Sequence, residues 1–356
     1  MNTSSEAVAR EVNNATLEML VSPVMTVAVP IIYLSVFVCS TPCNLLSLVA
    51  LLNVHYKRHT PTSVFAINLS LADLLYSAFL PLQVLYHLWG NDWPWGAALC
   101  GLTTTALNCN MHCSVLTTCA IALERYCGVV RPLRTKHWRT ARRAAIACVL
   151  IWAFVLITET PLLRSDLTLR VIELNITTCF DVLPRKLFLH QSVAYLYFLV
   201  VLLMFYMLPL AVLVSCYVAV ARGLHRSLPT AAEGSDGKRE VLSRRRAQTT
   251  VALATLCFVV CYLPTITLHG LHVVFHAQGK SLYRYYKLAL SINSLNCCFD
   301  PFVYYFASRE FRLALRRLLG RCVPLGEGEE LGTSELVSMT GEPRESKGHY
   351  EAVVDH

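Results

Sequence analysis

Charged side chains are scarce in this sequence. Only 15% of the 356 residues are Asp, Glu, Lys or Arg, whereas 55% are hydrophobic. A soluble domain usually has about a quarter charged residues. The composition therefore excludes an ordinary soluble protein and indicates a membrane protein, and the length fits one helical bundle with a tail.

Other features are also missing. Residues 1–22 lack a cationic start followed by a short apolar core and a small-residue cleavage site, so we expect no removable signal peptide. No internal repeat is present, which argues against a transporter. No paired catalytic groups and no metal-ligand spacing occur, so we expect no enzyme and no cofactor. The 15 cysteines lie mostly inside apolar runs, where free cysteine behaves as a small hydrophobe.

What the sequence does contain is seven long apolar stretches. Each is near or above the ~20 residues that a membrane-crossing helix needs. They cover residues 24–52, 62–88, 97–130, 144–163, 192–224, 247–275 and 283–307. We therefore predict an all-α membrane protein with a seven-transmembrane helix bundle over residues 23–307. We predict that residues 308–322 form a short amphipathic helix on the membrane surface and that residues 323–356 form a disordered cytoplasmic tail.

The orientation follows from the basic residues of the loops. Lys and Arg concentrate in the loops after the first, third and fifth stretches, which are therefore predicted to be cytoplasmic. This places residues 1–22 outside the cell as an N-terminal arm of a multi-pass plasma membrane protein. The Asn-x-Ser/Thr triplets at Asn2, Asn14 and Asn175 then lie outside and are predicted glycosylation sites. Cys322, after the amphipathic helix, is a predicted palmitoylation site.

Two acidic residues lie inside the predicted membrane helices, where charge is costly and usually functional. Asp73 and Asp300 share this depth with the polar residues Asn110, Ser114 and Asn296. One interpretation is a sodium site with oxygen ligands in the bundle core. The other is a hydrogen-bonded network with one aspartate protonated, since two close carboxylates do not both ionise. The sequence leaves both open.

Two further pairs lie at the ends of the third stretch. Glu124 and Arg125 stand at its cytoplasmic end, either as an ion pair that can release the arginine or as an ordinary interfacial arginine. Cys100, at its outer end, and Cys179 are the best candidates for a disulfide on the oxidising side. Such a bond would hold the loop before the fifth stretch against the third helix.

Motifs in every stretch together carry a resemblance to a known family. They are Asn44, Asp73, Trp93, Trp95, Cys100, Glu124-Arg125-Tyr126, Pro132, Trp152, Cys179, Pro209, Tyr217, Phe258, Cys261, Pro264, Asp300-Pro301 and Tyr304. In this order they resemble the rhodopsin-type (class A) G-protein-coupled receptors. The resemblance implies that Arg125, supported by Glu124, Tyr126, Pro132, Tyr217 and Tyr304, couples to a heterotrimeric G protein. It also implies an activation hinge at Phe258, Tyr262, Pro264 and Pro301.

Within this family, residues 178–183, 281–288 and 300–311 resemble the metabotropic purinoceptor cluster, which recognises nucleotides and anionic lipids. Its nearest branch implies an isoprenyl-glutathione-type lipid conjugate and coupling to Gα of the twelve/thirteen class. A nucleotide-activated receptor coupling to Gq or Gi is the alternative. Ile266 and His269 weaken the nucleotide alternative, because nucleotide-binding members carry a His and a basic residue at these two positions. A transporter is the remote alternative.

The family resemblance also implies binding partners, and it allows a light receptor to be considered. Arrestin and a receptor kinase are expected at the tail, membrane lipid around the bundle, and no nucleic acid. Ser294 stands where a retinal-binding lysine would be, which excludes a light receptor. Arg244 stands where some receptors have an acid that locks Arg125, so we expect Glu124 to be the only partner of Arg125.

The ligand site is predicted from side-chain chemistry in the outer half of the bundle. The third helix has no acid there to bind an amine, whereas Arg164 and Lys287 favour an anionic group. The predicted ligand-binding residues are Gln83, Tyr86, Thr104, Asn108, Arg164, His269, Tyr283 and Lys287. Any of the aromatic ones could instead belong to an interfacial belt. We expect Glu159 to pair with Arg164.

Overall fold

A computed structural model describes residues 8–10, 12, 14–57, 60–135, 137–182, 191–227, 235–276, 282–307 and 309–322. The chain divides into two compact units, Met1–Leu315 and Arg316–His356, and the bundle lies in the first. The predicted tail, residues 323–356, lies outside the described residues.

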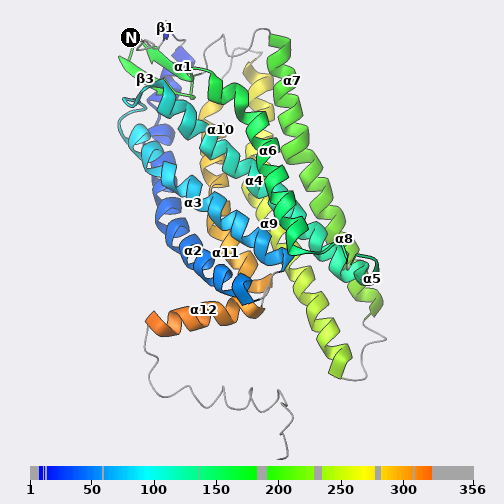
Figure 1. Ribbon diagram of the computed structural model, residues 1–356. Coiled ribbons are helices and arrows are strands. Elements are labelled where there is room, and N and C mark those ends of the chain that lie inside the picture. Colours follow the sequence, from blue (N-terminus) through cyan, green and yellow to red (C-terminus); the bar gives the residue numbers. More distant parts are fainter. Residues whose placement is uncertain are drawn as a thin grey trace, which may run out of the picture. The chain divides into compact units, whose positions relative to one another are not determined.

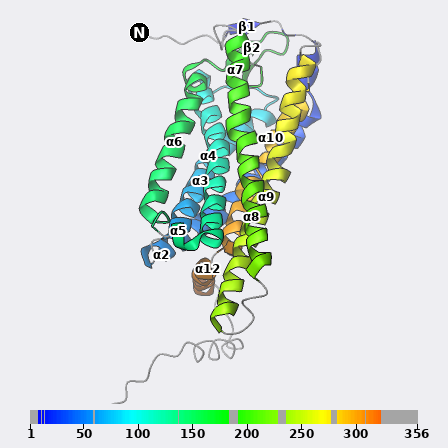
Figure 2. The same ribbon diagram turned by 90° about the vertical axis from the view of Figure 1, so that its right-hand side faces the viewer.

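The bundle is built from long helices that run lengthwise beside one another (Figures 1 and 2). In chain order they are α2 (Val29–Lys57), α3 (Pro61–Leu88), α4 (Gly96–Val130), α6 (Ala141–Arg164), α7 (Gln191–Leu202), α8 (Leu208–Ser227), α9 (Ser235–His276), α10 (Tyr283–Asn293) and α11 (Asn296–Ala307). π-Helical turns precede α2 (η1, Val24–Ala28) and join α7 to α8 (η2, Leu203–Met207). Helix α11 packs on α2, which closes the bundle.

Six helices of the described part of the chain are long and apolar enough to cross a membrane. The seventh predicted stretch is also helical, but it breaks between α10 and α11 at Ser294 and Leu295. There the backbone N–H of Ser294 bonds to Ser291, and that of Cys297 bonds to Ser294, in tight turns. The six spans and the broken seventh helix together agree with the predicted seven-helix bundle.

Several helices begin at residues other than the first residue of the corresponding apolar stretch. Helix α9 begins at Ser235, well before the apolar stretch, because the polar residues there are good helix formers and hydropathy detects only the part inside the bilayer. Thr60 and Thr140 are the N-caps of α3 and α6, where their side chains accept hydrogen bonds from the backbone N–H groups of Ser63 and Arg143. Helix starts are thus set by capping chemistry.

A small sheet and a short helix cover one end of the bundle, and neither was predicted. Strands β2 (Thr168–Val171) and β3 (Ile176–Cys179) form an antiparallel hairpin, and β1 (Val8–Arg10) pairs parallel with β2. Helix α1 (Asn14–Leu20) follows β1 (Figure 1). We call this the hairpin end. Helix α5 (Pro132–Thr135) lies at the opposite end.

The distribution of buried and exposed apolar side chains is that expected of a helix bundle surrounded by membrane lipid. A core cluster joins α4, η2, α8 and α9 through Val115, Phe205, Leu213 and Phe258, all at most 2% exposed. Large apolar side chains also point outward, such as Val149 (67% exposed) and Ile157 (72%). An outward apolar face of this extent marks a surface that contacts a membrane or another protein, and the long apolar helices indicate a membrane. The predicted amphipathic helix is α12 (Arg309–Cys322), with Phe311 buried and Arg316 exposed.

Candidate functional site

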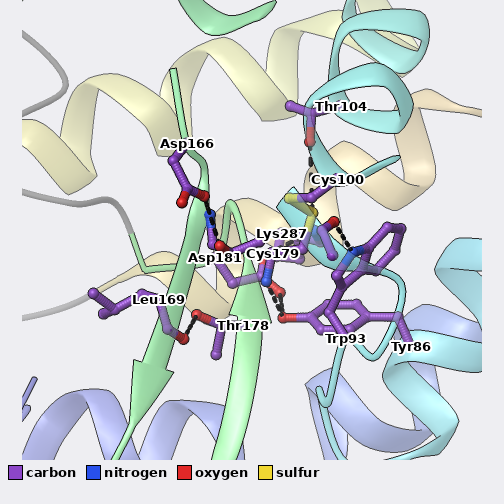
Figure 3. The surroundings of a disulfide bond; sticks show 12 residues. Tyr86, Trp93, Cys100, Thr104, Asp166, Leu169, Thr178, Cys179, Asp181 and Lys287 are labelled. Carbon is purple, nitrogen blue, oxygen red and sulfur yellow. Dashed lines mark hydrogen bonds and ion pairs between the residues drawn. A yellow bond between two sulfur atoms is a disulfide. The ribbon is translucent and has the colours of Figure 1, made fainter. Parts of the chain in front are cut away.

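A disulfide fixes the hairpin to the bundle. Cys100, at the start of α4, and Cys179, at the end of β3, are bonded with 5.7 Å between their Cα atoms, which confirms the predicted pair (Figure 3). The backbone N–H of Trp93 donates to Thr177 at 2.7 Å, and the N–H of Thr177 donates to Asp92 at 2.8 Å. The residues after β3 are therefore held over the bundle.

The most important of these residues is Asp181, which the sequence analysis did not select. Its carboxylate accepts hydrogen bonds from Lys287 Nζ (2.8 Å), Tyr283 Oη (2.9 Å) and Tyr86 Oη (2.8 Å). Figure 3 shows Lys287 and Tyr86 converging on it. The Lys287 side chain is only 5% exposed and that of Asp181 is fully buried. An acid two residues after the predicted disulfide was the signal that sequence reasoning missed.

The electrostatics of Asp181 favour its charged form. Burial is the largest single effect and raises the pKa of this carboxyl group, but the charge of Lys287, the neighbouring His87 and the hydrogen bonds to the carboxylate together more than offset it. Hydrogen bonds from Lys287 and Tyr86 act in the same direction. The pKa of Asp181 is therefore lower than the ordinary 3.8.

A cavity opens beneath this cluster, between α2, α3, α4, α9, α10 and α11. Its lining includes four predicted ligand residues, which are Gln83, Thr104, Asn108 and Lys287. It also includes Tyr33, Tyr76, Leu107, Asn110, Met111, Cys179, Phe180, Tyr262, Leu290, Asn293, Ser294, Asn296 and Cys297. The buried amide oxygens of Gln83 and Asn293 have no hydrogen-bond partner within the described part of the chain. They are acceptors available to a bound molecule.

The other predicted ligand residues lie elsewhere. Tyr86 and Tyr283 bond to Asp181 and are not among the residues that line the cavity. Arg164 is exposed at the end of α6, outside the lining. The side chain of His269 lies outside the described residues.

The expected pairing of Glu159 with Arg164 is wrong. Glu159 is 1% exposed and lies 2.9 Å from Nδ1 of His112. It also accepts a hydrogen bond from Asn108 at 3.2 Å. The reason is helical geometry, because Glu159 faces α4 inside the bundle whereas Arg164, more than a turn later, faces outward.

The two intramembrane aspartates are both buried and each is bonded to an amide. Asn110 donates to Asp73 at 3.0 Å, and Asn296 donates to Asp300 at 3.3 Å. Oδ2 of Asp73 and the hydroxyl of Ser114 have no partner among the described residues. Since Asn110 and Asn296 also line the cavity, this polar core is continuous with the cavity floor.

At the opposite end, Arg125 has more partners than predicted. Its Nη2 donates to Thr62 at 2.5 Å, while its Nε lies 3.3 Å from Glu124 without an in-line hydrogen bond. Glu124 instead accepts two hydrogen bonds from Arg139, at 2.6 and 3.1 Å. The expectation that Glu124 would be the only partner is therefore corrected, because Thr62 and Arg139 lie in a neighbouring helix and loop that sequence spacing does not bring together.

The structure describes the side chains of two of the other residues predicted for coupling. Tyr126 packs against the core cluster, and Tyr217 is 36% exposed. The side chains of Pro132 and Tyr304 lie outside the described residues.

Of the predicted hinge residues, Tyr262 lies between two cavities and Phe258 lines the second of them. Phe258 and Tyr262 stack in α9 with ring centroids 4.9 Å apart, within the two turns before Pro264. Tyr262 lines both the first cavity and a second one, which also contacts Phe258 and Asp300. Pro301 lies inside α11.

The predicted modification sites differ in what the structure describes. Asn14 is exposed at the start of α1, and Asn175 is exposed in the β2–β3 turn with a φ of 52°. Asn2 and the side chain of Cys322 lie outside the described residues.

Comparisons with known proteins agree with this arrangement. The pattern of the 7 transmembrane receptor (rhodopsin family) matches residues 43–304. The human S-geranylgeranyl-glutathione receptor P2RY8 is 40% identical over 88% of this chain and 85% of its own length. The purinoceptor 8 of Gallus gallus is 36% identical over 91% and 88%. Proteinase-activated receptor 1 of Xenopus laevis is 35% identical over 88% and 71%.

These relatives are receptors and not enzymes, as predicted. They also confirm the resemblance to the purinoceptor cluster, within which the sequence pointed to the eighth numbered member. Two thirds or more of each of these relatives is covered at 35% identity or above. The chain belongs to the rhodopsin family of 7 transmembrane receptors.

Proposed function

We propose that this receptor binds an extracellular anionic lipid conjugate of the isoprenyl-glutathione type and activates a G protein of the Gα twelve/thirteen class. Its family makes it a multi-pass plasma membrane receptor for a small molecule or peptide, acting on a heterotrimeric G protein. The ligand is inferred from the cavity together with the name of the human relative, S-geranylgeranyl-glutathione receptor P2RY8.

The observation that carries the ligand proposal is the mixed chemistry of the cavity. Lys287 provides a cation at the rim, and the unpaired amide oxygens of Gln83 and Asn293 accept hydrogen bonds. A glutathione group has carboxylates that can pair with Lys287, and it has peptide N–H groups that can donate to the two amide oxygens. Leu107 and Leu290 offer apolar surface to an isoprenyl chain. Because Asp181 already neutralises Lys287, an anionic ligand competes with Asp181 for it.

The proposed orientation places the hairpin end outside the cell. The basic loops at the opposite end support this, as do the exposed acceptors Asn14 and Asn175 at the hairpin end. Glycosylation at these sites and at Asn2, palmitoylation of Cys322, and arrestin and receptor kinase at the tail belong to the same proposal.

We also propose that sodium binds in the polar core. The unpaired Oδ2 of Asp73 and the unpaired hydroxyl of Ser114 are buried oxygens that suit a hard cation. Asn110, Asn296 and Asp300 would complete the site. When bound, the ion supplies positive charge that keeps the aspartates ionised. The alternative of one protonated aspartate predicts no sodium dependence of ligand affinity.

A ligand panel tests the main proposal. Cells expressing the receptor receive geranylgeranyl-glutathione, a lysophospholipid or a nucleotide, and activation of each Gα class is recorded. We expect a response to the glutathione conjugate through Gα twelve/thirteen. A response to nucleotides alone, through Gq or Gi, would instead favour the nucleotide receptor.

A matched pair of variants tests the site. Lys287→Gln should weaken an anionic agonist more than a neutral analogue, because it removes the charge at the cavity rim. Arg170→Gln removes an exposed cation of β2 outside the lining and should change neither potency. Equal losses for both agonists in Lys287→Gln would count against the assignment.

A further inference from the structure

Two arginines share the single carboxylate of Glu124, and they share it unequally. Arg139 donates to Oε1 from Nε at 3.1 Å and from Nη2 at 2.6 Å. Arg125 reaches Oε2 only with Nε, at 3.3 Å and without an in-line hydrogen bond. Short charge-assisted hydrogen bonds are the stronger ones. The carboxylate is therefore held mainly by Arg139, with one longer hydrogen bond from the Thr62 hydroxyl to Oε2 at 3.3 Å, and Arg125 is held mainly by Thr62.

The loop between α5 and α6 is built to place Arg139. The carbonyl of Thr135 accepts hydrogen bonds from the backbone N–H groups of Trp138 (2.9 Å) and Arg139 (3.1 Å). The hydroxyl of Thr135 in turn donates to the carbonyl of Cys127 in α4, at 2.9 Å. The Arg139 backbone is thus tied to α4 about one turn from Glu124.

Gly128 leaves the space that the Arg139 side chain occupies. A Cβ atom at Gly128 would lie 2.8 Å from Cζ and from Nη2 of Arg139, closer than any real contact. The guanidinium group therefore crosses directly over the backbone of α4. Any side chain at position 128 would push it away from Glu124.

We propose that Arg139 competes with Arg125 for Glu124 and thereby sets how readily the ligand-free receptor engages its G protein. The carboxylate has one negative charge, and pairing with Arg139 weakens its attraction for Arg125. Arg125 is then freer to leave Thr62 and meet the G protein. Arg139 acts through Glu124 and is a positioning residue. The inference depends on the family's activity and not on the proposed ligand.

The test measures the affinity of the ligand-free receptor, in lipid nanodiscs, for nucleotide-free heterotrimeric G protein. The heterotrimer is the one that the wild-type receptor binds best among the Gα classes. Arg139→Gln should lower this affinity about 5-fold, the equivalent of one ordinary hydrogen bond. Arg139→Lys keeps the charge without the fork and should restore part of the loss.

Gly128→Ala provides an independent route to the same effect. It should displace Arg139 and lower the affinity, although alanine is the better helix former and the fold is not weakened. Gly223→Ala is its matched control, since a Cβ atom there would make an ordinary contact with Val130 at 3.6 Å. We expect this control to bind like the wild type.

The decisive comparison uses receptors with Glu124→Gln. If Arg139 acts through Glu124, adding Arg139→Gln to this variant changes nothing further. A further loss of affinity would show that Arg139 supports the G protein by another route and would overturn the proposal. Unchanged affinity in the single Arg139→Gln variant, with a wild-type thermal midpoint, would overturn it as well.

Discussion

At the scale of single residues, the buried pair of Lys287 and Asp181 dominates the hairpin end. A charge of either sign is costly to bury, and each of these two is tolerated because the other is 2.8 Å away. Two tyrosine hydroxyls also donate hydrogen bonds to this carboxylate. The hairpin, α3 and α10 therefore meet at one carboxyl group, and a ligand that takes Lys287 must also disturb this junction.

Removing one partner should cost more stability than removing both. Asp181→Asn leaves the Lys287 ammonium buried without a counter-charge, and we expect a loss of about 3–5 kcal/mol. Adding Lys287→Met removes the stranded charge and should restore most of the stability. Thermal unfolding of the purified receptor in detergent measures both variants. A double variant less stable than Asp181→Asn would contradict this account of the pair.

The same pair predicts an acid limit to stability. The pKa of folded Asp181 is below its ordinary value, so its contribution is complete above about pH 4, the unfolded pKa, and is lost as the pH falls through the folded value. The thermal midpoint of the wild type minus that of the Asp181→Asn/Lys287→Met variant should be constant from pH 8 to pH 5 and should fall below about pH 4. A difference that is already lost near pH 6 would show that another group is titrating.

Residue identity predicted chemistry better than it predicted contacts. Lys287 was recognisable as a cation in an apolar stretch, and Cys100 with Cys179 as an oxidised pair. Asp181 was not recognisable as a site residue, because its position depends on the path of a loop. Glu159 was assigned to Arg164 by proximity in the chain, although the helical turn directs it to His112. Partners far apart in the sequence require the three-dimensional arrangement.

At the scale of elements, hydropathy identified every long helix, because each must present about 20 apolar residues to the bilayer. It did not identify β1, β2, β3 or α1. These short elements carry little hydropathy signal, and β1 pairs with a strand more than 150 residues later. The break at Ser294 and Leu295 was also missed, because the polar turn at Ser294 lies inside a stretch that is apolar overall.

The hairpin should depend on its disulfide. The bond closes a loop of 79 residues, and losing such a link typically costs about 2–5 kcal/mol. Replacing Cys100 and Cys179 together by serine should lower the thermal midpoint and release Asp181 from the cavity rim, so that agonist binding is also lost. Cys39→Ser, which changes an exposed free cysteine, is the matched control. Wild-type agonist affinity in the double serine variant would refute this role of the hairpin.

At the scale of the whole molecule, the receptor has the proposed ligand cavity at one end and Arg125 at the other. The two cavities share Tyr262 and Asn296 in their walls, so a shift of α9 about Pro264 changes both. A ligand that prefers one arrangement of α9 therefore shifts the population of the receptor. Linkage requires that a bound G protein raise ligand affinity by the same factor.

The most direct test of this connection is agonist-stimulated nucleotide exchange on the G protein by wild-type and Arg125→Ala receptors. Both are assayed in membranes matched for receptor number by an antibody to an N-terminal tag. We predict that Arg125→Ala reaches the surface and binds agonist but loses at least ten-fold in exchange rate, since ~1.4 kcal/mol of lost contact is a factor of ten. Undiminished exchange by Arg125→Ala would contradict the account.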